Sequence, residues 1–247
     1  MEEDVIRAEK LNKVFSIKGK KPLTALNGLS LSVKKGELTA VIGPDGAGKT
    51  TLMRLIAGLM NPTSGSLTVL GMDSVKDAEE IQSRISYMPQ KFGLYEDLTV
   101  QENLDLYADL HGVPQEKRPE RFGKLLDMMG LAPFTGRFAG KLSGGMKQKL
   151  GLACTLVRSP DLLLLDEPTV GVDPLSRREL WKILKTFVKE EHLSIFVSTA
   201  YMNEAEICSH VFVLHKGNLL ADGTPPDIVM FSGGVAACFG EEEDLFR

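Results

Sequence analysis

The sequence predicts an α/β fold built on a parallel sheet, and two apolar runs carry that prediction. The run Leu38 to Ile42 leads into a glycine-containing loop and then into a segment with helical periodicity from Lys49. The run Leu162 to Leu165 is too short for a helix and follows Pro160, which is typical of a strand buried on both faces. Strand patterns alternate with helical ones along the chain, which predicts right-handed crossovers within one sheet.

Length and composition describe an ordinary globular chain. Its 247 residues are 43% hydrophobic and 25% charged, enough for a substantial core. The net charge of −4 gives no overall basic character, so we expect no nucleic acid partner. Cys154, Cys208 and Cys238 are widely spaced and odd in number, which argues against a disulfide framework and suits a reducing compartment. The acidic start predicts no secretory signal, and no apolar run approaches the roughly 20 residues that cross a bilayer.

Alternating and apolar patterns predict the elements of the first 90 residues. The helix from Lys49 is expected to bury Leu52, Leu55, Ile56 and Leu59 and to end at Gly58. Ser64-Gly65 reads as a turn. The expected strands are Val5 to Val14, Leu29 to Val33, Ser66 to Leu70 and Ile85 to Met88.

The second half begins with a mostly helical pattern from Thr99 to about Val157, broken at Gly112 to Pro114 and at Pro133 to Gly140. The acidic Glu241 to Asp244 is interpreted as a solvated tail. The remaining expected elements are a helix at Ser176 to Glu190, a buried strand at Ser194 to Ser198, and a hairpin of Val211 to Leu214 with Asn218 to Ala221.

The loop after the first buried strand carries the clearest chemistry. Its residues fit the phosphate-binding pattern G-x-x-x-x-G-K-[ST], in the strand–loop–helix context that the pattern needs. Glycines let backbone N–H groups turn toward an anion, and the positive end of the following helix adds to that field. The ammonium of Lys49 can reach the outer phosphates, and the hydroxyl of Thr50 can hold magnesium. We therefore predict a nucleotide site formed by Gly43, Pro44, Asp45, Gly46, Ala47, Gly48, Lys49, Thr50 and Thr51.

Two carboxylates close the leucine run. Asp166 at the carboxyl end of a parallel strand is the natural magnesium ligand, and Glu167 is placed to orient or deprotonate an attacking water. Such a pair often only caps the next turn, but the phosphate loop upstream favours a functional role.

A second glycine-containing stretch, Leu142 to Gly145, precedes an apolar helix and is called here the LSGG segment. Ser143 is predicted to cap that helix, and the paired glycines would allow something outside to approach the backbone. An ordinary capped helix start is the simpler interpretation, although exposed N–H groups at a helix N-terminus also suit a phosphate.

Taken together, the phosphate loop, Gln90, the LSGG segment, the LLLLDEP run, Asp173 and the STAYMNEAE stretch resemble an ATP-binding cassette ATPase over nearly the whole chain. The resemblance implies one nucleotide-binding domain over residues 1–247. Its parts would be a RecA-like parallel sheet of the P-loop NTPase type, an N-terminal antiparallel β subdomain, and a helical subdomain at about 92–160.

The resemblance also implies roles for residues. Two cassettes would sandwich two ATP molecules, so Ser143, Gly144 and Gly145 would touch the partner's ATP rather than this chain's own. Gln90 would join the magnesium and act with Glu167 in catalysis, Asp173 would lie near the dimer seam, and Phe15 would stack on adenine. Core packing is the alternative for Phe15.

The expected assembly follows from the same resemblance. The FGLYEDLTVQENL run resembles the segment that grips a helix of a transmembrane permease. The chain looks most similar to the first ATPase half of bacterial drug-exporter subunits, in which two cassettes lie in tandem. We expect it in the cytoplasm, peripheral on the inner face of the cell membrane.

Three positions depart from the family pattern. Where the family has a γ-phosphate-contacting histidine after Ser198-Thr199, this chain has Ala200, and loss of one such donor costs about 10²–10³ in rate. We predict a cassette that binds ATP but hydrolyses it slowly, while its Ser143 completes the partner's site. Met146 stands where the family usually has a glutamine after the LSGG segment. Asp45 puts a carboxylate in the phosphate loop, where we expect it to point away.

Two other classes share part of this pattern. A soluble cassette ATPase acting on ribosomes or DNA has the same core motifs, but such proteins usually carry long insertions or basic arms, and this chain has neither. The low net charge and the FGLYEDLTVQENL run favour transport. A phosphate-loop kinase or GTPase is disfavoured by the LSGG segment and Gln90.

Overall fold

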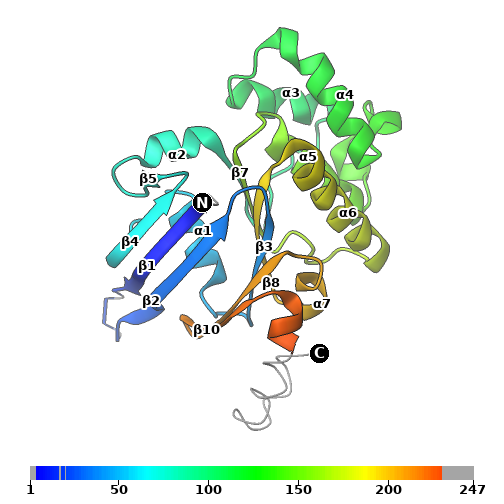
Figure 1. The fold of residues 1–247 in the computed structure, drawn as a ribbon. Helices are drawn as coiled ribbons and strands as arrows, with labels where there is room; N and C mark the ends of the chain where they lie inside the picture. Colours follow the sequence, from blue (N-terminus) through cyan, green and yellow to red (C-terminus); the bar gives the residue numbers. More distant parts are fainter. Residues whose placement is uncertain (1–3, 17, 20, 230–247) are drawn as a thin grey trace.

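The computed structural model describes residues 4–16, 18–19 and 21–229, and it contains two sheets with helices around them (Figure 1). The larger sheet has six strands in the order β10-β9-β3-β8-β7-β6. Five of them run parallel, and only β10 is antiparallel to its neighbour. The bounds are β3 Leu38–Ile42, β6 Ile85–Met88, β7 Leu162–Asp166, β8 Ser194–Thr199, β9 His210–His215 and β10 Asn218–Gly223.

The central strands are buried on both faces. Every residue of β3, β7 and β8 is buried, as expected for apolar runs in a parallel sheet. The prediction from the leucine run is confirmed, and so is the hairpin of β9 with β10. Because parallel strands end at one edge, the loop after β3 and the carboxylates after β7 share that edge.

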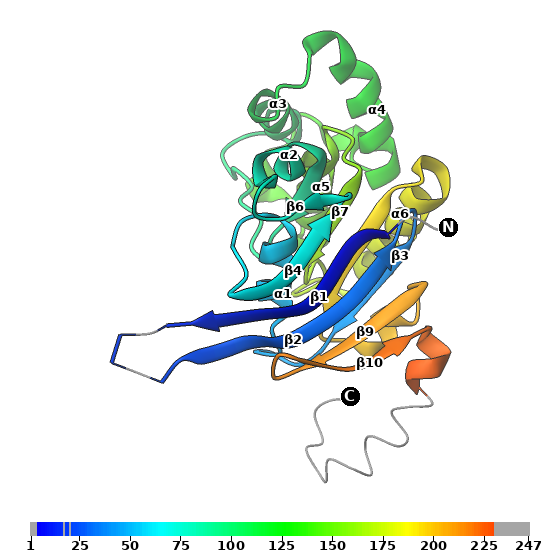
Figure 2. The ribbon, with the colours of Figure 1, turned by 60° about the vertical axis from the view of Figure 1, so that its left-hand side comes forward.

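The smaller sheet is antiparallel, with the order β2-β1-β4-β5. Figure 2 shows β1 and β2 as a long hairpin that projects beyond β4. Ser64-Gly65 belongs to β4 and is not the turn we expected. Gly65 lies against the backbone of β1, and a Cβ there would lie 2.2 Å from the Lys10 carbonyl oxygen. The bounds are β1 Asp4–Phe15, β2 Leu23–Lys34, β4 Ser64–Val69 and β5 Met72–Asp73.

The helices cover both faces of the larger sheet. Helix α1 packs between the two sheets within one apolar cluster, while α5 and α6 cover the opposite face in the other cluster (Figure 1). Helices α3 and α4 lie beyond α5. The bounds are α1 Lys49–Ile56, α2 Ala78–Arg84, α3 Val100–Leu110, α4 Arg118–Met129, α5 Gly144–Leu156, α6 Pro174–Glu191 and α7 Met202–Ala205.

Several expectations about helices need correction. Leu59 is 57% exposed rather than buried, because α1 ends at Ile56 and Gly58 adopts a positive φ of 65°. The short helices α2 and α7 were not expected. The predicted breaks near Gly112 and Pro133 are confirmed as connections without α-helix. The acidic tail and Cys238 lie outside the described residues.

Over the described ranges, every helix is too short or too polar to span a lipid bilayer.

Candidate nucleotide site

The phosphate loop, residues 43–50, runs from β3 into α1 and is held tightly from behind. A Cβ on Gly43 would lie 2.1 Å from the backbone oxygen of Leu214, so only glycine allows this approach. Gly48 caps α1 with φ of 111°, and a Cβ there would lie 2.6 Å from the Ala25 carbonyl oxygen. The packing therefore fixes the loop, and the first N–H groups of α1 have no acceptor within the helix.

Lys49 is buried under this loop with only 4% of its side chain exposed. Its Nζ donates to the carbonyl oxygens of Gly43 at 2.7 Å and Pro44 at 3.1 Å. The same Nζ lies 3.0 Å from Oε1 of Glu167. Lysine has three donors, and these three acceptors account for them.

Glu167 follows β7 and lies at the centre of the site. Its Oε1 forms the ion pair with the ammonium of Lys49, and its Oε2 accepts a hydrogen bond from Gln90 Nε2 at 2.8 Å. The structure thus brings the predicted catalytic pair, Glu167 and Gln90, into direct contact beside the phosphate loop.

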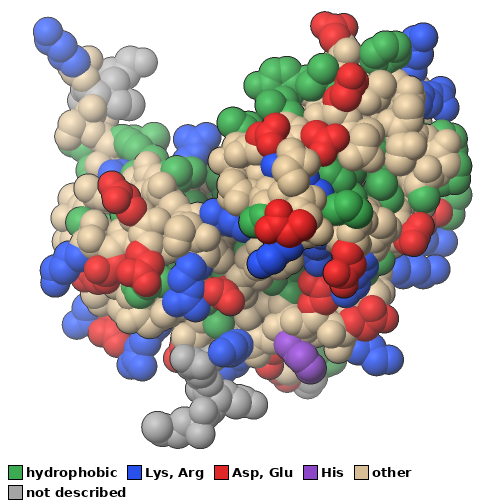
Figure 3. All heavy atoms as spheres, turned by 90° about the horizontal axis from the view of Figure 1, so that it is seen from above, with side chains coloured by type: hydrophobic (Ala, Val, Ile, Leu, Met, Phe, Trp, Pro, Cys, Tyr) green, Lys and Arg blue, Asp and Glu red, His purple; other side chains and the backbone are tan. Residues whose placement is uncertain are grey.

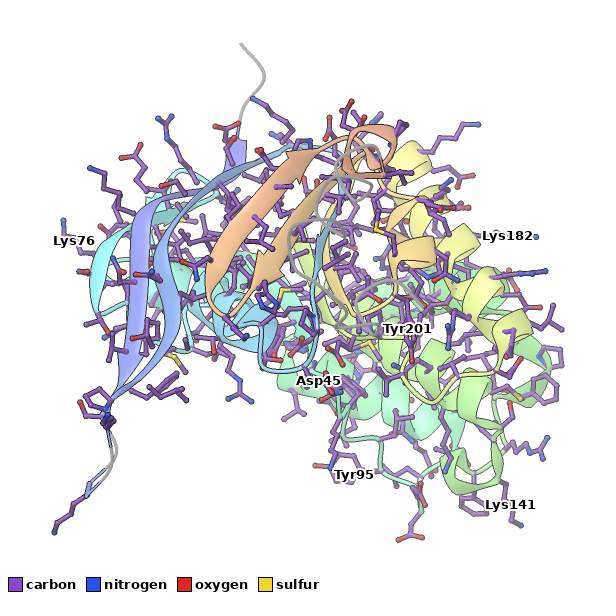
Figure 4. All side chains as sticks on the ribbon, turned by 90° about the horizontal axis from the view of Figure 1, so that it is seen from below. Asp45, Lys76, Tyr95, Lys141, Lys182 and Tyr201 are labelled. Carbon is purple, nitrogen blue, oxygen red and sulfur yellow. The ribbon has the colours of Figure 1, made fainter. Side chains whose placement is uncertain are left out.

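A cavity of about 410 Å³ opens in front of these groups. Phe15 is half-buried and lines it from the end of β1, so it is not a core residue. Asp45 is exposed and also lines the cavity (Figure 4). The other predicted residues on its wall are Gly46, Ala47, Gly48, Lys49, Thr50, Thr51, Gln90 and Glu167.

Asp166 lies deeper, at 1% exposure, and its two oxygens are held by neighbouring strands. Ser198 of β8 donates to Oδ1 at 2.6 Å, and the Tyr87 hydroxyl of β6 donates to Oδ2 at 3.3 Å. Burial, together with the charge of Asp166, raises the pKa of Tyr87 to about 12, so this phenol stays protonated and remains a donor.

These oxygen groups suit magnesium. The hydroxyl of Thr50 and the carboxylate of Asp166 are hard donors of the kind that Mg²⁺ binds through one or two protein ligands, with water and phosphate completing its shell. Asp166 is held in one orientation, as a metal ligand requires.

The LSGG segment lies elsewhere and does not line this cavity in the described structure. Ser143 caps α5 as predicted, accepting a hydrogen bond from the Met146 N–H at 3.3 Å. Ser143 and Gly144 are exposed, whereas Gly145 is buried against Ser176 at the start of α6. Gln148 of α5 also donates to the carbonyl oxygen of Pro168, so α5 packs on the loop that follows Glu167.

Asp173 caps α6 by accepting from the N–H groups of Leu175 and Ser176. These hydrogen bonds, that of Ser176 foremost, lower the pKa of Asp173. Ala200 is exposed directly after β8, at the carboxyl edge of the sheet where the phosphate loop also lies.

Sequence reasoning missed five lining or supporting residues. Leu23, Thr24 and Ala25 of β2 line the cavity because the first hairpin folds over the phosphate loop. Ser198 and Tyr87 hold Asp166 from within apolar strands. The sequence does not single out Tyr87 or Ser198, because Ser86 in β6 and Ser194 and Thr199 in β8 are also polar.

Comparison with known proteins agrees with this geometry. Residues 26–170 match the family model described as ABC transporter. The chain belongs to the ABC transporter family. This assignment confirms the resemblance in the sequence, and the phosphate loop and β7 carboxylates lie within the matched region.

Curated relatives carry transporter names. The ABC cassette is 52% identical over 234 residues to the probable multidrug ABC transporter ATP-binding protein YbhF of Escherichia coli, covering 95% of this chain and 40% of that protein. It is 35% identical over 219 residues to the bacitracin transport ATP-binding protein BcrA of Bacillus licheniformis, covering 88% and 69%. The ABC cassette therefore spans about two fifths of YbhF.

Solved cassettes share its fold. CbiO1 of Clostridium perfringens, part of the ABC transporter complex cbiONQ, aligns with a TM-score of 0.84 and 27% identity over 96% of this chain and 94% of that one. The ATP-binding cassette MJ0796, a dimer bound to ADP and Pi, aligns with a TM-score of 0.79 and 26% identity over 89% and 98%. The predicted combination of a parallel core with an antiparallel β subdomain is confirmed.

Proposed function

We propose that this ABC cassette binds and hydrolyses ATP as the motor of an exporter for drug-like or other small substrates. One observation carries the proposal: Lys49, Glu167 and Gln90 meet at the wall of a cavity closed behind by the phosphate loop. This juxtaposes a cation for phosphate, a carboxylate for water and an amide that orients it.

In this proposal each group has a defined task. Lys49 and the N–H groups at the start of α1 bind the outer phosphates, and Phe15 stacks on the adenine. Glu167 accepts a proton from the attacking water, held in place by Gln90. When bound through Thr50, Gln90 and Asp166, Mg²⁺ would neutralise charge on the phosphates.

A second cassette is needed in this proposal, because the LSGG segment lies away from the chain's own phosphate loop. Ser143, Gly144 and Gly145 would cover the ATP of the partner cassette. The length of YbhF, more than twice the matched region, supports a second cassette in tandem on one polypeptide. The dimeric MJ0796 cassette supports pairing of this kind.

A transmembrane permease is the other proposed partner, with the cassette peripheral to the membrane on its cytoplasmic side. A cavity of about 310 Å³ lies between β6 and the lobe of residues 92–160, where Phe92 and Tyr107 stack at 5.1 Å and the exposed Leu59 forms part of the wall. We propose that a helix of the permease inserts there. On the face seen in Figure 3, acidic and basic side chains are interspersed, which does not favour nucleic acid.

Ala200 is the reason for the slow ATP hydrolysis in this proposal. It offers no donor to the γ-phosphate, so this chain's own site would bind ATP and turn it over slowly.

The decisive experiment is ATP binding by calorimetry with and without Mg²⁺. We expect magnesium-dependent binding in the native chain, and loss of about 100-fold or more in affinity in Lys49→Ala because the buried cation is removed. Lys182→Ala, an exposed lysine of α6, is the control and should bind normally. Absence of ATP binding in the native chain would overturn the proposal. Co-sedimentation with membranes only when a permease is co-expressed would separate a transport role from a soluble one.

A further inference from the structure

Ser198 of β8 makes a second contact besides the one that holds Asp166. It is fully buried at 0% exposure and lies opposite Asp166 in the parallel register of β7 and β8. Its hydroxyl donates to Oδ1 of Asp166 at 2.6 Å and accepts from the backbone N–H of Glu167 at 3.0 Å. One small hydroxyl therefore joins the proposed magnesium ligand to the backbone of the residue that carries the proposed catalytic carboxylate.

The contact to Asp166 is the stronger of the two. An O–H donor to a carboxylate at this distance is charge-assisted and directional. With Tyr87 on Oδ2 from the other side, Asp166 is held between the strands that flank its own. Partners that orient a metal-binding carboxylate in this way affect metal affinity without touching the metal.

The contact to Glu167 controls its backbone. Glu167 has φ of 51°, a left-handed conformation that is uncommon for a residue with a side chain. Its N–H is shared between the Ser198 hydroxyl at 3.0 Å and the Ser198 carbonyl oxygen at 3.1 Å. This turn directs the side chain back to Lys49 and Gln90, where it makes the contacts described above.

We propose that Ser198 is a positioning residue that orients Asp166 for magnesium and Glu167 for water. The inference rests on the proposed function, since it assigns roles within the same site. A hydroxyl is required because the group must donate on one side and accept on the other. Ser198 would therefore act on the magnesium-dependent part of ATP binding, while the phosphate loop and Phe15 would supply the rest.

Two variants that are isosteric with each other isolate the hydroxyl. Ser198→Thr keeps the hydroxyl and adds a methyl group, whereas Ser198→Val has the size of threonine without the hydroxyl. Ser194→Ala is the matched control: Ser194 is on the same strand at 1% exposure, and its hydroxyl accepts from the Gly36 N–H at 2.8 Å, at the end of β8 away from the site. Thermal unfolding of all variants reports on folding.

The readout is ATP affinity measured in EDTA and again in Mg²⁺, which needs no hydrolysis. In Ser198→Val we expect affinity in EDTA to stay within about twofold of the native chain and the gain from Mg²⁺ to fall by about tenfold or more. Ser198→Thr and Ser194→Ala should keep the native gain. If Ser198→Val does not fold, Ser198→Ala replaces it.

A native gain from Mg²⁺ in Ser198→Val would overturn the inference, and so would an equal loss in Ser194→Ala. These results would leave the proposed function intact. Failure of the native chain to bind ATP in either condition would instead overturn the proposed function, and the role of Ser198 with it.

Discussion

Lys49 and Glu167 form an ion pair of 3.0 Å in which the side chains are only 4% and 9% exposed. The other two donors of Lys49 go to the carbonyl oxygens of Gly43 and Pro44, which belong to the tightly packed loop. Of the three acceptors, only the carboxylate is on a side chain that can move. We therefore expect an incoming phosphate to take the place of this carboxylate, so that Glu167 would compete with nucleotide for Lys49.

Replacing Glu167 should strengthen nucleotide binding, because its carboxylate would no longer compete for Lys49. In Glu167→Gln we expect ADP to bind about three- to tenfold more tightly, roughly 1 kcal/mol, because a negative charge is removed beside the phosphates. Calorimetry with ADP in EDTA excludes any effect of hydrolysis. Glu204→Gln, a carboxylate at 2% exposure outside the cavity, is the control. Unchanged or weaker ADP binding in Glu167→Gln would show that the ion pair does not oppose nucleotide.

The two glycines of the LSGG segment should differ in their tolerance of alanine. A Cβ on Gly145 would lie 2.1 Å from Oγ of Ser176, whereas one on Gly144 meets nothing nearer than 3.8 Å. We expect Gly145→Ala to lower the free energy of unfolding by about 1–3 kcal/mol and Gly144→Ala to leave it nearly unchanged. Urea denaturation measures both. Ser176→Gly should restore stability to Gly145→Ala, and no rescue would mean that this clash is not the cause.

Restoring a donor after β8 should raise the rate. In Ala200→His we expect ATP hydrolysis per site to increase by roughly tenfold or more, because an imidazole can donate to the γ-phosphate as charge builds on it. The measurement is phosphate release by the purified chain at high protein concentration, where pairs can form. Ala200→Leu adds bulk without a donor. An equal increase in Ala200→Leu, or none in Ala200→His, contradicts the explanation.

Glu191 links the end of α6 to α4 through Lys124 at 2.8 Å and Arg121 at 3.3 Å. Burial acts to raise the pKa of Glu191, but the hydrogen bond from Lys124 and the charge of Arg121 outweigh it, so the pKa lies below its usual value. The stabilisation that ionised Glu191 contributes to the fold is therefore complete above the pKa of Glu191 in the unfolded chain. It is lost as the pH falls through the pKa of Glu191 in the folded chain.

The corresponding variant is Glu191→Gln. We expect this variant to lower the free energy of unfolding by about 1 kcal/mol at pH 7. The difference from the native chain should shrink as the pH falls below about 5. Thermal unfolding at pH 7, 5 and 4 tests this. A difference that does not depend on pH would assign the cost to packing rather than to charge.

Local chemistry made part of the site predictable from sequence. The phosphate loop depends on residue types within eight positions, and the Ser143 cap depends on a hydrogen bond to the residue three positions later. Asp166 and Glu167 were recognisable because they end a run that only a buried strand explains. In each case the determining contacts are close along the chain.

The remainder depends on contacts between distant segments. Ser64-Gly65 is typical of a turn, because nothing near Gly65 in the sequence shows that a Cβ there would lie 2.2 Å from the Lys10 carbonyl oxygen. Leu59 fits the periodicity of α1, but the helix ends before reaching it. The role of Ser198 follows from strand register alone, since a shift of one residue would turn its side chain away from Asp166.

The packing of α5 on the loop after Glu167 places two proposed functions side by side. Gly145 rests on Ser176, and Gln148 donates to the Pro168 carbonyl oxygen. In the proposed pair, the helix that begins at the LSGG segment, which would cover the neighbour's nucleotide, therefore touches the loop that follows this chain's own Glu167. A displacement of either segment would be transmitted to the other, so this contact would couple the two nucleotide sites of the pair.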